Sequence, residues 1–224
     1  MFVGHYAAAL AARAAEPRAP LWSYVLGCQA IDIAWCGLIL AGVEKAGVDP
    51  SLPGSSLVLS YMPYTHGLPT AVLWSIAAGA GLMLLLKLPR RVGVILGLVV
   101  FSHWFLDFLV HRPDLPLLWN GPMLGLGLWN YPLPEQVLEM GLLALAGAAW
   151  GWRRGLEGRT WKAATGFLTF LLFLQVVPML SPLSEGRLSL GGSPLVAYLV
   201  TCIAAWMAEP TVARMGAGGL SPRA

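Results

Sequence analysis

Charged side chains are scarce in this 224-residue chain. Only 11% of the residues are Asp, Glu, Lys or Arg, against roughly 25% in soluble globular proteins. The net charge is +3 and the basic residues form no cluster on a soluble fold, which argues against nucleic acid as a partner. The three cysteines lie inside apolar segments and predict no disulfide framework. The stretch Met1–Ala15 has no basic region ahead of it, so no cleavable signal peptide is expected.

Apolar residues, in contrast, make up 57% of the chain and gather in long runs. A run of about 20 such residues can cross a bilayer as a helix. The runs predict an all-α, polytopic transmembrane helical bundle with about six spanning helices, over residues 21–43, 69–88, 92–111, 135–152, 161–180 and 194–208. A short N-terminal helix over 2–15 is expected to be embedded in the membrane. We expect one integral membrane domain, 1–208, with the histidines in 1–140, additional helices in 141–208, and a flexible tail over 209–224.

The positive charges predict the orientation of this bundle. If the turn Glu16–Pro20 is cytoplasmic, all but three of the 14 Lys and Arg residues fall on the cytoplasmic side. The exceptions are Lys45, Arg112 and Arg187. Cytoplasmic loops of membrane proteins are enriched in Lys and Arg in this way. The sequence therefore predicts a multi-pass membrane protein with this turn and most of the C-terminus in the cytoplasm.

Three polar residues interrupt the run 92–111 at intervals of four, namely His103, Asp107 and His111. Helical spacing places them on one face, with neighbours about 6 Å apart. At about 1.5 Å rise per residue, His103, His5 and Asp32 are expected at similar depths in the membrane. Asp107 and His111 continue toward the outer face, to which the loop carrying His66 also returns.

This set of residues predicts a metal site. A carboxylate at the middle of a membrane helix costs about 2.5–3.5 kcal/mol, and the available Lys and Arg lie at helix ends. A bound divalent ion would offset that cost, and the imidazole and carboxylate donors suit zinc best, with iron or manganese as alternatives. Glu139 is expected to be a second metal ligand, a general base, or a hydrogen-bond partner of Gln136, Asn130 or water. Cys28 and Cys36 share a face with Asp32, but buried cysteines commonly serve as small apolar residues.

At these residues the sequence resembles a family, the bacterial membrane-bound metal-dependent hydrolases, whose pattern is loosely related to zinc-dependent phospholipase C. The resemblance lies in Gly4-His5, in Asp32, in Thr65-His66 and in Ser102-His103-x3-Asp107. A group often described as hypothetical proteins or permeases shares the runs at 111–116 and 127–130. The resemblance covers residues 1–140 and implies an inner (plasma) membrane location, with metal ligation by His5, Asp32, His66, His103 and Asp107. The chain departs from the broader family at Ile33, Ala34 and Gly67.

The first functional hypothesis is therefore a membrane-embedded hydrolase that uses metal-activated water on a lipid or other amphiphilic ester or phosphoester. His66 or Glu139 would act as ligand or general base. His111 and Arg112 would bind a phosphate head group, or alternatively would only anchor the protein at the interface. The loop 112–134 would cover the site. The alternatives are a transporter or permease for metal ions or protons, against which the lack of a visible internal repeat counts, and a non-catalytic protein whose helices are held together by the metal.

Overall fold

The computed structural model describes residues 1–119, 121–180 and 184–209. These residues are mostly helical, as predicted. In chain order the helices are α1 (His5–Ala15), α2 (Leu21–Cys28), α3 (Ala30–Ala41), α4 (Leu68–Leu85), α5 (Arg90–Val110), α6 (Pro132–Leu156), α7 (Lys162–Leu180) and α8 (Ser193–Ala208). A short 3₁₀ helix, η1 (Leu128–Asn130), precedes α6, and a π-helical turn, η2 (Leu188–Gly192), leads directly into α8.

Fewer helices qualify as membrane spans than the six that the sequence predicts. Among the described residues, α4, α5 and the continuous segment Leu188–Ala208 are long and apolar enough to cross a membrane. Helices α2 and α3 could together form a fourth span, although they meet at an angle of 51°. Helix α7 has only a shorter apolar part, Lys162–Val177, and the Glu, Gly, Trp and Arg residues of α6 lower its hydropathy. The described residues therefore support three or four spans, and the predicted count of six is not confirmed.

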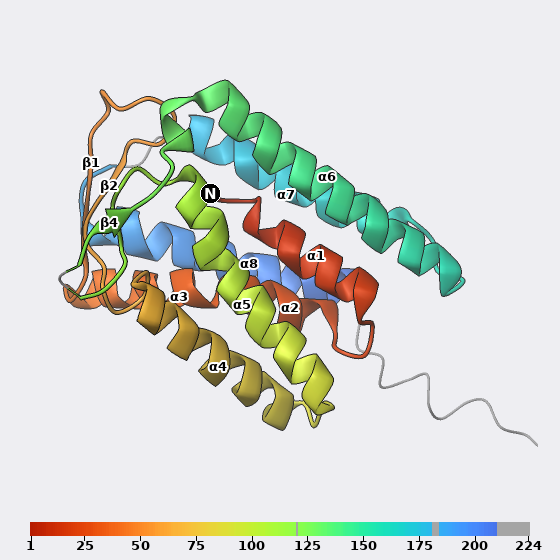
Figure 1. Ribbon diagram of the computed structural model, residues 1–224. Helices are drawn as coiled ribbons and strands as arrows, with labels where there is room; N and C mark the ends of the chain where they lie inside the picture. Colours follow the sequence, from red (N-terminus) through yellow and green to blue (C-terminus); the bar gives the residue numbers. More distant parts are fainter. Residues whose placement is uncertain (120, 181–183, 210–224) are drawn as a thin grey trace, which may run out of the picture.

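The two predicted loops contain small sheets, so the chain is not purely helical. Within 44–67, strands β1 (Lys45–Val48) and β2 (Leu57–Tyr61) pair antiparallel, with Lys45 opposite Tyr61. Within 112–134, β3 (Leu115–Pro116) pairs with β4 (Met123–Leu124). Pairing satisfies backbone hydrogen-bonding groups that an irregular loop would leave open. Both hairpins lie at the same end of the helical bundle (Figure 1).

Helix α5 runs through the middle of the bundle, with α4 on one side and α1 on the other (Figure 1). Helix α1 packs in turn against α6, and α2 packs against α5 and α8. The α4–α5 contact depends on glycine, because a Cβ atom added at Gly79 would lie 2.8 Å from the backbone of Gly97. Small residues of this kind allow membrane helices to approach closely. The close packing brings residues of α1, α3 and α5 to one level.

The end of the bundle opposite the hairpins is held by buried ion pairs. The carboxylate of Glu209 is fully buried and accepts hydrogen bonds from Arg13, Arg154 and Arg159. These contacts join the ends of α1, α6 and α8. Glu209 is the first residue of the predicted tail, and residues 210–224 of that tail lie outside the described residues.

Candidate metal centre

Asp107 lies at the centre of the polar cluster, on the buried face of α5. One turn earlier on that helix, His103 places its Nε2 atom 3.1 Å from Asp107 Oδ2. The other carboxylate oxygen, Oδ1, lies 3.1 Å from His5 Nε2 and 3.3 Å from His111 Nε2. The four side chains are almost completely buried. His111 is therefore part of the cluster, whereas the sequence interpretation placed it at the outer rim.

Asp32 reaches the same cluster from the break between α2 and α3. The helix is interrupted at Gln29, and Asp32 lies in the first turn of α3, where the helix dipole favours a carboxylate. Asp32 Oδ1 lies 3.3 Å from His103 Nε2 and 3.4 Å from His66 Nε2. His66 Nε2 is also 3.6 Å from Asp107 Oδ2. The structure thus brings together all five residues that were predicted as ligands from separate segments of the chain.

The ring of His103 is oriented by the main chain. Its Nδ1 atom lies 2.8 Å from the carbonyl oxygen of Cys28, directly before the helix break. A carbonyl oxygen can only accept, so Nδ1 must carry the proton of this hydrogen bond. In the neutral ring, Nε2 then has a free lone pair that faces the two carboxylates. This is the arrangement of a histidine prepared to bind a metal.

His66 and His111 are oriented in the same way by polar side chains. The Nδ1 atom of His66 lies 2.8 Å from the hydroxyl of Thr65, which donates a hydrogen bond to the buried carboxylate of Glu44. Burial raises the pKa of the Glu44 carboxyl, and the hydrogen bond from Thr65 opposes that shift. The Nδ1 atom of His111 lies 2.9 Å from Asp114 Oδ1. Both histidines therefore turn Nε2 toward the cluster.

The spacing of the donor atoms fits a small ion. Donors at about 2.0–2.2 Å from a tetrahedral ion are about 3.3–3.6 Å apart. Four pairs among Asp32 Oδ1, Asp107 Oδ2, His66 Nε2 and His103 Nε2 are separated by 3.1 to 3.6 Å. Among the described residues, His103 Nε2 has no hydrogen-bond partner despite these short distances. The cluster could therefore hold a metal ion.

The simplest alternative is that protonated histidines pair with the carboxylates. Two imidazolium ions would neutralise Asp32 and Asp107. A neutral His5, whose Nδ1 has no partner among the described residues, can then carry its proton on Nε2 and donate to Asp107, which also accepts a hydrogen bond from the Met1 ammonium at 3.2 Å. Protons can therefore satisfy part of the cluster, and a metal ion is the alternative that the donor spacing also fits.

Glu139 and Arg112, which were predicted as catalytic and substrate-binding residues, lie beside the cluster. One carboxylate oxygen of Glu139 accepts hydrogen bonds from the backbone nitrogens of Phe2 and Gly4, and the other accepts from Gln175. Glu139 thus fixes the segment that leads to His5. Arg112 donates to Asn130 and to the carbonyl of Pro53. These contacts leave both predicted roles untested.

Three supporting residues were not identified from the sequence: Glu44, Asp114 and Tyr198. The hydroxyl of Tyr198, on α8, donates a hydrogen bond to Asp32 Oδ2 at 2.7 Å. Tyr198 lies in the part of the chain for which the sequence offered no specific role. In the sequence, Asp114 follows His111 by three residues, a spacing that permits a local contact between the two side chains. Glu44 directly follows the predicted span 21–43, and only the fold brings it to Thr65.

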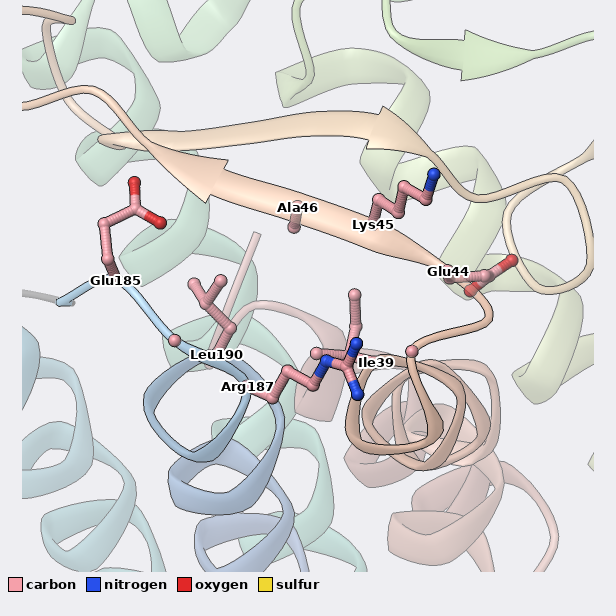
Figure 2. A pocket seen from close by; sticks show the side chains of 9 residues that line it. Ile39, Glu44, Lys45, Ala46, Glu185, Arg187 and Leu190 are labelled. Atoms are coloured by element: carbon pink, nitrogen blue, oxygen red, sulfur yellow. The ribbon is translucent and has the colours of Figure 1, made fainter.

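A pocket of about 280 Å³ lies next to this support, between β1, the end of α3 and the segment before α8. Figure 2 shows Glu44 and Glu185 at opposite ends of the pocket, with Arg187 reaching toward α3. A Cβ atom at Gly42 would lie 2.6 Å from the Arg187 guanidinium, so Gly42 leaves room for that side chain. Through Glu44 the pocket borders the hydrogen-bond chain that ends at His66.

Fold and site together define a helical protein with three or four candidate membrane spans and a buried cluster of histidines and aspartates that could hold a metal ion. A comparison with protein-family models, with curated proteins and with solved structures finds no match to this chain.

Proposed function

We propose that this protein is a membrane-embedded metal-dependent hydrolase with a zinc site, iron and manganese being the alternatives. The observation that supports this most is the position of His103 Nε2. It lies within 3.3 Å of an oxygen of both Asp32 and Asp107 while Nδ1 is occupied by the Cys28 carbonyl. The resemblance to membrane-bound metal-dependent hydrolases includes Asp32, His103 and Asp107, and it supports the same proposal.

The proposed ligands of the ion are Asp32, His66, His103 and Asp107. When bound, such an ion polarises an ester or phosphoester group and makes water a stronger nucleophile. Asp32 would lie on the side of the ion that substrate can reach, because 15% of its side chain is exposed, whereas the Asp107 side chain is only 3% exposed. The hydrogen bond from Tyr198 keeps Asp32 Oδ2 occupied, so Oδ1 alone is presented to the cluster.

We assign the substrate class from the surroundings of the site. The candidate spans support a membrane location for the cluster, and the esters and phosphoesters accessible there belong to lipids. Arg112 retains one buried guanidinium nitrogen, Nη1, without a hydrogen-bond partner among the described residues. That nitrogen could donate a charge-assisted hydrogen bond to a phosphate oxygen while Nε and Nη2 stay bound to Asn130 and Pro53. The proposed substrate is therefore a lipid or other amphiphilic phosphoester.

The test is turnover by purified protein in liposomes that contain phospholipid and a polyprenyl phosphate. Release of the head group or of phosphate is expected from the metal-loaded wild type. His103→Gln and Asp32→Asn should lower the rate at least about 100-fold, as expected when a metal site is disabled. Ser75→Ala is the matched control, since this buried hydroxyl on α4 bonds only to the carbonyl of Ala71. Metal-loaded wild type without turnover of any such ester would contradict the hydrolase.

One observation favours a transporter as the second candidate. Helices α2 and α3 form a bent pair at the very residues that supply Asp32 and the Cys28 carbonyl. Secondary transporters commonly bind ions at such interrupted helices. Uptake of zinc, manganese or protons into protein-containing liposomes, abolished by Asp32→Asn, would support this candidate. If the protein binds metal but shows neither turnover nor flux, the remaining hypothesis is a structural role, in which the ion holds the helices together.

A further inference from the structure

The carboxylate of Asp107 presents both of its oxygens to histidines, on two different sides. Oδ2 faces His66 and His103, and Oδ1 faces His5 and His111. His103 has a single nitrogen available, because its Nδ1 is bound to the Cys28 carbonyl. His103 can therefore serve one ion only, whereas a carboxylate can bind one ion through each oxygen.

We propose that the cluster holds two metal ions and that Asp107 bridges them. The first ion is the one assigned above to Asp32, His66, His103 and Asp107 Oδ2. The second is bound by His5, His111 and Asp107 Oδ1. This inference rests on the proposed metal site, and it adds a second binding position on the α1 side of α5. Paired ions that share a carboxylate are common in enzymes that cleave phosphoesters.

His5 has the properties of an unfilled ligand. Its side chain is 1% exposed, and neither ring nitrogen has a hydrogen-bond partner within the described part of the chain. A buried imidazole without partners costs free energy of about 1–3 kcal/mol. The ring stacks on that of His103, with centroids 3.8 Å apart and planes within 7°. The stack holds His5 Nε2 against Oδ1 while His103 Nε2 lies against Oδ2.

His111 also directs its Nε2 atom at Oδ1, at 3.3 Å. Asp114 binds its Nδ1, and the indole of Trp129 lies against the ring, 4.1 Å between centroids. The Met1 ammonium donates a hydrogen bond to Oδ1 at 3.2 Å, and a second ion would take the place of this cation.

The charges near His5 also favour a second cation. Glu135 and Glu139 of α6 are buried, with 6% and 1% exposure. Their hydrogen bonds in the described structure come from backbone amides and from glutamines, not from Lys or Arg. The Met1 ammonium is a cation that acts on both carboxylates, and buried charges are costly unless they are paired. A dication held by His5 and Asp107 would take over this role for Glu135 and Glu139.

The proposal is tested by the number and the magnetic coupling of bound ions. Purified wild type is stripped with a chelator, reloaded with Mn²⁺, and analysed by elemental analysis and electron paramagnetic resonance. We expect two ions per chain and loss of the isolated-ion signal as the second ion binds, because bridged ions couple. His5→Gln and His111→Gln should each retain one ion and regain the isolated signal. Ser75→Ala should behave as the wild type.

The outcomes separate this inference from the proposed function. One ion per chain in the wild type, with His5→Gln unchanged, would overturn the second site and leave the first intact. Two ions without coupling would overturn the bridge. No bound ion at all would overturn the proposed function itself. If the histidine variants fail to fold, ion number and coupling in the wild type still decide between one site and two.

Discussion

The hydroxyl of Tyr198 donates a hydrogen bond to Asp32 Oδ2 across 2.7 Å, joining two residues 166 positions apart in the sequence. The bond connects α8 to the start of α3, where the helix is interrupted. It occupies one oxygen of Asp32 and leaves the other directed at His66 and His103. Helix α8 therefore takes part in shaping the candidate metal centre.

Replacement of Tyr198 by phenylalanine should weaken metal binding without unfolding the protein. Loss of a partner that orients a ligand typically costs about 10- to 100-fold in metal affinity. Competition with a metal-binding dye, in detergent, measures that change for Tyr198→Phe. Tyr24→Phe is the control, since its hydroxyl bonds to the Glu16 carbonyl, away from the cluster. Equal affinity in the two variants would exclude an orienting role for Tyr198.

Thr65→Val should interrupt the chain from Glu44 to His66. Valine keeps the shape of threonine but removes the hydroxyl that lies between the Glu44 carboxylate and His66 Nδ1. We expect metal affinity to fall about 10- to 100-fold and the free energy of unfolding to fall by about 1–3 kcal/mol, because buried polar groups lose a partner. Thr201→Val, which removes a hydroxyl that donates to the Ala197 carbonyl within α8, should not change the affinity. A normal affinity in Thr65→Val would contradict the orienting role.

Two neighbouring glycines of α4 test the close approach of α4 and α5. Gly79→Ala places a methyl group 2.8 Å from the backbone of Gly97, so α4 and α5 must separate. We expect a loss of about 1–3 kcal/mol, the usual effect of overpacking. Gly81→Ala, where no atom lies within 4 Å, should be neutral or stabilising. Thermal unfolding in detergent compares the two, and equal melting temperatures would show that the contact is not tight.

The turn at Glu16 predicts a pH dependence of stability. Hydrogen bonds from Arg18 lower the pKa of the Glu16 carboxyl from 4.5 to about 2. A lowered pKa means that the stabilisation is complete above pH 4.5 and is lost as the pH falls toward 2. Because Arg18 is half exposed, the effect should be about 1 kcal/mol or less. The difference in melting temperature between wild type and Glu16→Gln should shrink over this range, and a constant difference would contradict the assignment.

The spacing of polar residues in the sequence located much of the site. The interval of four between His103 and Asp107 needs only helical geometry, and α5 forms as expected. The shared depth of His5 and Asp32 followed from helix lengths, and both residues lie in the cluster. The depth estimate misplaced His111, but the interval of four did not, because its backbone nitrogen still donates to the Asp107 carbonyl and its Nε2 lies 3.3 Å from Asp107 Oδ1.

The remaining features depend on tertiary contacts that no local pattern records. An apolar run cannot reveal the bend at Gln29, since the helices on both sides of it are apolar. It also cannot show that Glu139 would meet the backbone of Phe2 and Gly4. In the sequence, nothing distinguishes Tyr198 from another tyrosine in an apolar helix. Its contact with Asp32 depends on the packing of α8 beside α3. The predicted six spans are not confirmed, because α6 and α7 were judged by their apolar content, whereas α6 is less hydropathic and the apolar part of α7 is shorter than a span requires.

The metal content of purified protein tests the central claim most directly. Wild type and Asp107→Asn are purified in detergent, offered zinc, iron and manganese in turn, washed free of loosely bound ions and analysed for metal. We predict at least one tightly bound divalent ion per chain in the wild type and a loss of most of it in a folded Asp107→Asn variant. A wild-type protein that retains none of these metals, or an Asp107→Asn variant that binds them equally well, would contradict the account.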